Sequence, residues 1–141
     1  MGSDVERMLR DYAAAWSSGD VEKVASFLTD DCVIENLGGG MIYCGQEEIK
    51  SWVRDNFASI PDLKIEVKSL FVAGEWAGGE WVQSGTYTGE VGGVPVTGQK
   101  FLERGASIIE LHGGKIKREA LYWDTLSFLR QLRVMPEAAS E

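Results

Sequence analysis

The sequence predicts a single α+β domain, in which three N-terminal helices pack against a curved antiparallel sheet to form a cone. Two observations support this fold. Apolar residues recur at helical spacing through most of the first 60 residues, whereas the period changes to two from Leu63 onward. Glycine pairs separate the later β-favouring runs, so we expect consecutive strands to be antiparallel neighbours. Helices on one side of such a sheet leave one end of the cone open, and that opening is the expected ligand pocket.

The first two helices have clear start and stop signals. Ser3 and Glu6 form a capping box, and Gly19 ends the first helix in the left-handed conformation. Asp20 caps a second, shorter helix, which stops at residues 29–31. The residues expected to face inward are Val5, Met8, Leu9, Tyr12, Ala13 and Trp16 in the first helix, and Val21, Val24, Ala25, Phe27 and Leu28 in the second.

A short strand, a glycine turn and a third helix follow. Residues 32–36 are typical of a strand, residues 38–40 of a turn, and residues 41–44 of a returning hairpin strand. The third helix runs from residue 46 to about residue 59 and ends at Pro61. Its expected inner face comprises Ile49, Trp52, Val53 and Phe57.

Four long strands complete the predicted sheet. A last helix then presents its apolar residues to the domain, and residues 136–141 are expected to form a frayed tail. There is no internal repeat and no linker, so residues 1–141 are expected to form a single domain. The predicted strands are residues 63–74, 79–90, 97–111 and 115–124. The turns between them are expected at Gly78-Gly79, Gly92-Gly93 and Gly113-Gly114. The apolar residues of the last helix are Leu126, Phe128, Leu129 and Leu132.

The composition restricts the class of function. Acidic residues outnumber basic ones by 22 to 14, and the resulting net charge of −8 argues against binding to nucleic acid or to an anionic membrane. No apolar run approaches the roughly 18 residues of a membrane span, and the N-terminus has no signal segment. Two cysteines and one histidine form neither a disulfide framework nor a zinc site. We therefore expect a cytoplasmic protein without a metal.

Four stretches carry a family resemblance: YAAAWSSGDVEKVASFLTDDCVIEN, IPDLKIEV, SGTYTGEVGGVPVTG and GGKIKREALYWDTLSFLRQL. The chain resembles the SnoaL-like polyketide cyclases, in the nuclear-transport-factor-like superfamily that also holds ketosteroid isomerases. The resemblance implies intramolecular aldol ring closure of a hydrophobic, polyketide-like small molecule, with no metal or organic cofactor. It also implies an oligomer, and we expect a homodimer formed through the outer sheet face. Related sequences often carry histidines where this chain has Glu119 and Tyr87.

Asp124 is the candidate catalytic residue. It follows Leu121, Tyr122 and Trp123 at the predicted strand-to-helix junction, where a carboxylate can cap the helix or transfer a proton. The resemblance implies the second role, because the family places an acid/base aspartate at the end of the last strand. Proton transfer would require Asp124 to lie in a dry, apolar pocket. Asp124→Asn would then lower turnover by about 10²–10⁴-fold.

The candidate pocket residues are aromatic or polar positions expected on inward faces. Strand alternation places Tyr122 on the face of Asp124, and the polar Gln83 among aromatic residues suggests ligand orientation or a buried hydrogen bond. Strand carboxylates at Glu35, Glu103 and Glu119 fit a pocket, but solvent or an interface is the favoured interpretation. The predicted ligand pocket comprises Tyr12, Trp16, Trp52, Trp81, Gln83, Tyr87 and Tyr122, for which core packing is the alternative.

Other functions stay open from the sequence. The isomerase mechanism needs a carboxylate where this chain has Asn36, and an amide cannot relay a proton at neutral pH. The epoxide hydrolase mechanism needs an arginine that bridges two aspartates. The residues of this chain that come closest to that pattern are Glu103-Arg104. The alternatives to a cyclase are a non-catalytic domain that binds small molecules, or a related hydrolase or lyase.

Overall fold

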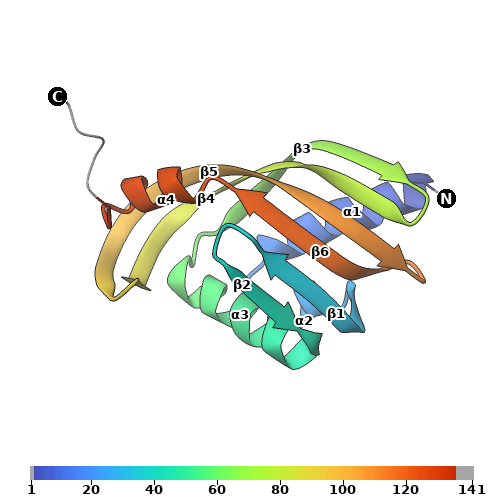
Figure 1. Cartoon of the computed structure of the whole chain (residues 1–141), viewed down its shortest axis with the longest axis horizontal. Helices are drawn as coiled ribbons and strands as arrows, with labels where there is room; N and C mark the ends of the chain where they lie inside the picture. The colour runs from blue at the N-terminus through green and yellow to red at the C-terminus, as the bar shows by residue number, and fades with distance from the viewer. Residues whose placement is uncertain (1, 136–141) are drawn as a thin grey trace.

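A computed structural model describes residues 2–135 and shows an α+β fold with a curved, unclosed sheet (Figure 1). The six strands are ordered β2-β1-β6-β5-β4-β3, and α1 passes behind the sheet in the view of Figure 1. The predicted tail at residues 136–141 lies outside the described residues. The elements are α1 (Gly2–Trp16), α2 (Val21–Ala25), β1 (Leu28–Asn36), β2 (Met41–Cys44), α3 (Gly45–Ser59), β3 (Lys64–Ala73), β4 (Trp76–Val91), β5 (Val94–His112), β6 (Lys115–Trp123) and α4 (Thr125–Gln131).

The hydrophobic core lies between the first three helices and the concave face of the sheet. The predicted apolar stripes face inward: Leu9 and Tyr12 of α1 are buried, as are Ile49 and Val53 of α3. Helix α1 contacts β3 and helix α3 contacts β1, so the two helices cover different parts of the sheet. Between them the concave face is not filled by backbone, and this arrangement positions the site described below.

The start and stop signals are partly confirmed. Gly19 has φ of 75°, and Asp20 caps α2 by accepting a hydrogen bond from the Lys23 amide at 3.1 Å. Helix α1, however, already begins at Gly2, so Ser3 lies inside the helix rather than before it. Helix α2 ends at Ala25, and the chain enters β1 at Leu28 instead of residue 32. Leu28 is buried as predicted, but as a strand residue.

One predicted turn is wrong. The chain reverses at Gly74-Glu75, and Gly78 and Gly79 lie inside β4. Both glycines are needed there for space rather than for a turn. A Cβ on Gly79 would collide with the Ser69 carbonyl oxygen, and one on Gly78 would collide with the Phe71 ring and lie 2.8 Å from the Ser107 carbonyl oxygen. The strand therefore begins three residues earlier than the sequence predicted.

The first and last strands are parallel neighbours, which the sequence did not predict. Strand β1 pairs with β6 in parallel, with Ile34 opposite Glu119 and Asn36 opposite Leu121. The remaining neighbours are antiparallel, as predicted for β3 to β6. The parallel pairing places the end of β1 beside the end of β6, where Trp123 Nε1 donates a 2.7 Å hydrogen bond to Asn36 Oδ1.

No helix within residues 2–135 combines the length and the apolar composition that a membrane crossing requires.

Candidate functional site

A cavity of about 560 Å³ opens between the concave face of the sheet and helices α1 and α3. This volume lies in the usual range for small-molecule sites, and aromatic walls with a few polar groups are typical of them. The aromatic residues that line it are Tyr12, Trp16, Tyr43, Trp52, Trp81, Tyr87, Trp123 and Phe128, and the polar ones include Asn36, Gln83, Glu103, Ser107 and Glu119.

Strand alternation explains which side chains line the cavity. Along β5 the odd-numbered positions face inward, so that Glu103 and Ser107 lie on the same face as the buried Phe101 and Ile109. In β4 the same alternation turns Trp81, Gln83 and Tyr87 toward the cavity. This face of β4 therefore forms part of the cavity wall.

A hydrogen-bonded group around Glu119 forms one wall of the cavity. Tyr12 Oη donates to Glu119 Oε1 at 2.7 Å, and Ser107 also hydrogen-bonds the Glu119 carboxylate. Trp81 Nε1 donates in turn to Ser107 Oγ at 2.9 Å. Burial raises the pKa of Glu119, and the two hydrogen bonds act in the opposite direction. Burial, together with the nearby Glu119, raises the pKa of Tyr12, so Tyr12 remains a donor.

Glu103 is a second buried carboxylate, and it differs from Glu119 in having an unused oxygen. Its side chain is 5% exposed and lines the cavity opposite Gln83 of the neighbouring strand. Its Oε2 has no hydrogen-bond partner within residues 2–135. Burial, and then the negative charge of Asp124, raise the pKa of Glu103 to about 8. A carboxyl group with this pKa can both accept and donate a proton near neutral pH.

Asp124 has the geometry of a helix cap. Its side chain is exposed, and its Oδ1 accepts a hydrogen bond from the Ser127 amide at 3.0 Å at the start of α4. Asp124 is not among the residues that line the cavity. The cap fixes α4, whose Phe128 packs edge-on against Trp123 with ring centroids 5.4 Å apart. Asp124 therefore supports the cavity wall indirectly.

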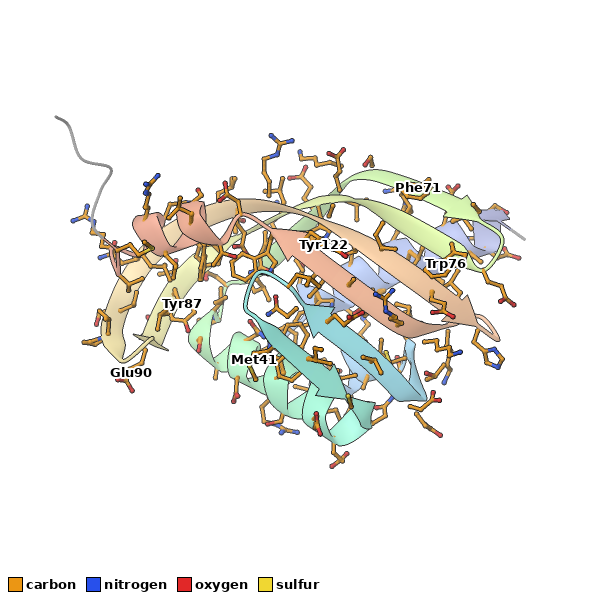
Figure 2. The ribbon with its side chains drawn as sticks, viewed as in Figure 1. Met41, Phe71, Trp76, Tyr87, Glu90 and Tyr122 are labelled. Atoms are coloured by element: carbon orange, nitrogen blue, oxygen red, sulfur yellow. The ribbon has the colours of Figure 1, made fainter. Side chains whose placement is uncertain are left out.

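Tyr122 lies on the convex face of the sheet and is 49% exposed, so it does not line the pocket (Figure 2). The prediction treated Asp124 as part of the strand and counted back from it. The strand ends at Trp123, and the cap conformation of Asp124 breaks the alternation. Trp123, not Tyr122, faces the cavity.

The other six predicted pocket residues, Tyr12, Trp16, Trp52, Trp81, Gln83 and Tyr87, line the cavity together. Glu103 and Glu119 were considered from the sequence, but solvent or an interface was favoured for both. The sequence signal for Glu103 and Glu119 is a charged side chain at the same spacing as the inward-facing apolar residues of its strand. Glu35 does face outward, where it pairs with Arg118.

Residues 2–135 contain no group of three or more His, Cys, Asp or Glu side chains with the geometry of a metal site. Glu103 and Glu119 are the buried acids of the cavity, and no histidine or cysteine is among its lining residues.

Comparison with known proteins shows the family of this chain. The SnoaL-like polyketide cyclase family matches residues 6–132, which is most of the chain. The chain belongs to the SnoaL-like polyketide cyclase family. A comparison of this SnoaL-like chain with curated proteins found no match.

Several solved structures share the fold of this SnoaL-like protein. AclR from Streptomyces galilaeus, a proposed hydroxylase, has a TM-score of 0.84 and 18% identity over 99% of this chain and 91% of its own. A protein with a ketosteroid isomerase-like fold from Catenulispora acidiphila, solved in complex with trimethylamine, has a TM-score of 0.79 and 21% identity over 92% of this chain and 93% of its own. IdmH from Streptomyces antibioticus, a proposed polyketide cyclase, has a TM-score of 0.77 and 23% identity over 92% and 98%.

Proposed function

We propose that the protein is an acid/base enzyme that acts on a hydrophobic small molecule in the cavity, with Glu103 as the group that transfers the proton. The observation that carries this proposal is the Glu103 carboxylate, which is buried and lines the cavity with an oxygen free of protein partners. A catalytic base needs such an oxygen to reach the substrate. The family membership supports ring closure as the reaction class.

The proposed reaction is an intramolecular aldol closure. Ionised Glu103 removes a proton from a carbon next to a substrate carbonyl, and the electron pair of that C–H bond forms an enolate. The enolate carbon attacks a second carbonyl of the same molecule, so that a carbon–carbon bond forms and the attacked oxygen becomes an alkoxide. The alkoxide takes the proton back from Glu103. We assign to the Gln83 amide, opposite Glu103 on the neighbouring strand, the hydrogen bond to the enolate oxygen.

This assignment moves the acid/base role from Asp124 to Glu103, and Asp124→Asn tests the difference. Asparagine is also a good helix cap, so α4 should be kept. Because an exposed charge contributes about 0–1 kcal/mol, we expect the plateau rate to stay within about fivefold of the wild type. Removing the negative charge should lower the pKa of Glu103, so the pH midpoint of the reaction should move to lower pH.

The measurement is hydrogen–deuterium exchange at the α-carbon of 2-tetralone in D₂O, followed by NMR between pD 5 and 9. This readout detects proton abstraction by the protein before the natural substrate is identified. A loss of several hundredfold in Asp124→Asn would return the catalytic role to Asp124. If 2-tetralone binds in the cavity, as seen by tryptophan fluorescence, but exchanges no faster than in buffer, the cavity is a binding site and not an active site.

We also propose that the protein is a homodimer formed through the convex sheet face. Phe71, Leu102, Ile108 and Tyr122 expose between 40% and 55% of their surface on this face. The first and last are labelled in Figure 2. Exposed apolar patches of this kind are typical of interfaces, and two copies of one such face are self-complementary about a two-fold axis.

Light scattering at micromolar concentration should therefore give twice the 15.5 kDa mass of one chain. Ile108→Glu should shift the mass to that of the monomer, because it places an unpaired charge at the centre of the face. Ser51→Glu adds the same charge at an exposed position of α3, on the other side of the sheet, and serves as the matched control. A monomeric wild type, or a dimeric Ile108→Glu, would contradict the proposed interface.

A further inference from the structure

The charged residues that line the cavity are all acidic. They are Glu80, Glu90, Glu103 and Glu119, and no lysine, arginine or histidine of the described chain lines it. Two of the four, Glu103 and Glu119, are 5% exposed. A ligand that carries a carboxylate or phosphate would find no positively charged side chain in this cavity, and its charge would be desolvated beside acidic groups.

The two buried acids are not equivalent toward a ligand. Glu119 already accepts hydrogen bonds from Tyr12 and Ser107. Glu103 Oε2, in contrast, has no protein partner within residues 2–135. A buried carboxylate oxygen without a partner is unfavourable, so Glu103 is where a bound molecule gains most by supplying a positive charge or a donor.

Two tryptophans lie beside β5, on its two neighbouring strands, close to Glu103 in the sheet register. Gly105, two residues along the same face of β5, pairs with Trp81 of β4 on one side and with Trp123 of β6 on the other. Both tryptophans line the cavity. Because Gly105 has no side chain, the Trp81 ring occupies the space above it, where a Cβ would collide with the indole. A Cβ on Gly38 would collide with the Trp123 ring in the same way.

The polar edges of both indoles are already used by the protein. Trp81 Nε1 donates to Ser107 Oγ at 2.9 Å, and Trp123 Nε1 donates to Asn36 Oδ1 at 2.7 Å. The rings are thus held in place as parts of the cavity wall. Fixed aromatic rings beside a carboxylate are the arrangement by which proteins recognise organic ammonium ions.

We propose that the substrate of this site carries an organic ammonium group, which binds against the carboxylate of Glu103 and the indole rings of Trp81 and Trp123. This inference rests on the proposed function and specifies the class of substrate. The ammonium supplies the positive charge that Glu103 lacks among protein groups. It also favours the ionised form of Glu103, which is the form that acts as a base. The apolar remainder of the molecule occupies the aromatic part of the cavity.

The test compares phenyltrimethylammonium with tert-butylbenzene, its neutral isostere, and with benzoate as an anion. Binding to the wild-type protein is measured by isothermal titration calorimetry and by tryptophan fluorescence. Cation–π contacts and the carboxylate together should make phenyltrimethylammonium bind roughly tenfold or more tightly than tert-butylbenzene. Benzoate should not bind detectably.

Glu103→Gln should lower the affinity for phenyltrimethylammonium by roughly tenfold and leave that for tert-butylbenzene unchanged, because only the charge is removed. Glu66→Gln, which removes the same charge at an exposed position of β3, should change neither affinity. Equal wild-type affinity for the cation and its neutral isostere would overturn the proposal, and this comparison does not depend on how any variant folds. An unchanged affinity for phenyltrimethylammonium in folded Glu103→Gln would also overturn the proposal.

The exchange assay with 2-tetralone separates this inference from the proposed function, because 2-tetralone is neutral. Exchange that depends on Glu103, without preferential binding of the cation, would refute the ammonium proposal alone. Preferential binding of the cation without any exchange would refute proton transfer and retain the ligand class.

Discussion

Replacement of Glu103 by glutamine is expected to lower the rate of α-proton exchange from 2-tetralone by about 10²–10⁴-fold. Glutamine has nearly the same shape as glutamate, and it keeps a polar group opposite Gln83. It cannot take up a proton at neutral pH, so the reaction loses its base while the cavity keeps its walls. The expected loss is the range usually observed when a positioned general base is removed.

The pH dependence of the exchange rate tests whether Glu103 is the base. In the wild type the rate should rise with pH through the pKa of Glu103, about 8, because the ionised form is the base. In Glu103→Gln this rise should disappear. A variant that binds 2-tetralone and keeps its exchange rate with the same pH dependence would show that another group accepts the proton. Tyr12→Phe is the matched control, since it removes a hydroxyl that donates to Glu119 and leaves Glu103 in place.

The same replacement is expected to stabilise the fold near neutral pH. Glu103 has a pKa of about 8 in the folded protein, compared with about 4.5 when exposed. The folded state therefore holds a proton that the unfolded state releases between these values, and the contribution of Glu103 to stability falls as pH rises through this window. At pH 7 the penalty amounts to about 3 kcal/mol, and Glu103→Gln removes it.

Urea unfolding of both proteins at one concentration, between pH 4 and pH 8, measures this effect. At pH 4 the two free energies of unfolding should agree, because Glu103 is protonated in both the folded and the unfolded state. The variant should become progressively more stable than the wild type as the pH increases toward 8. A difference that is the same at every pH would mean that Glu103 does not titrate in this range. Loss of activity with gain of stability would be the mark of a functional residue held in an unfavourable environment.

The sequence predicted the elements of the fold well because their signals are local. Helical spacing placed Leu9, Tyr12, Ile49 and Val53 inward, and they are buried. The errors concern features that depend on distant residues. Gly78 and Gly79 resemble a turn in isolation, but their real constraint is the approach of the neighbouring strand, including Phe71. The parallel pairing of β1 with β6 joins segments about 85 residues apart, and no local pattern indicates it.

The cavity walls could be predicted more fully than the proposed acid/base residue. Six predicted residues line the cavity, because helical spacing and strand alternation already indicate which side chains face inward. The position of Asp124 after aromatic residues fits a helix cap and an acid/base residue equally well, and only its exposure and its bond to Ser127 separate them. Glu103 could have been identified by its phase with Phe101 and Ile109, but its missing partner is visible only in three dimensions.

The parallel contact between β1 and β6 also bears on how the chain can fold during its synthesis. Strand β1 emerges from the ribosome well before β6, its second neighbour in the sheet, because β6 follows it by about 85 residues in the chain. Until then β1 and β5 both carry unpaired backbone edges, and α1 to α3 have no complete sheet to cover. The nascent chain must therefore remain soluble in an unfinished state, for which its acidic composition is well suited.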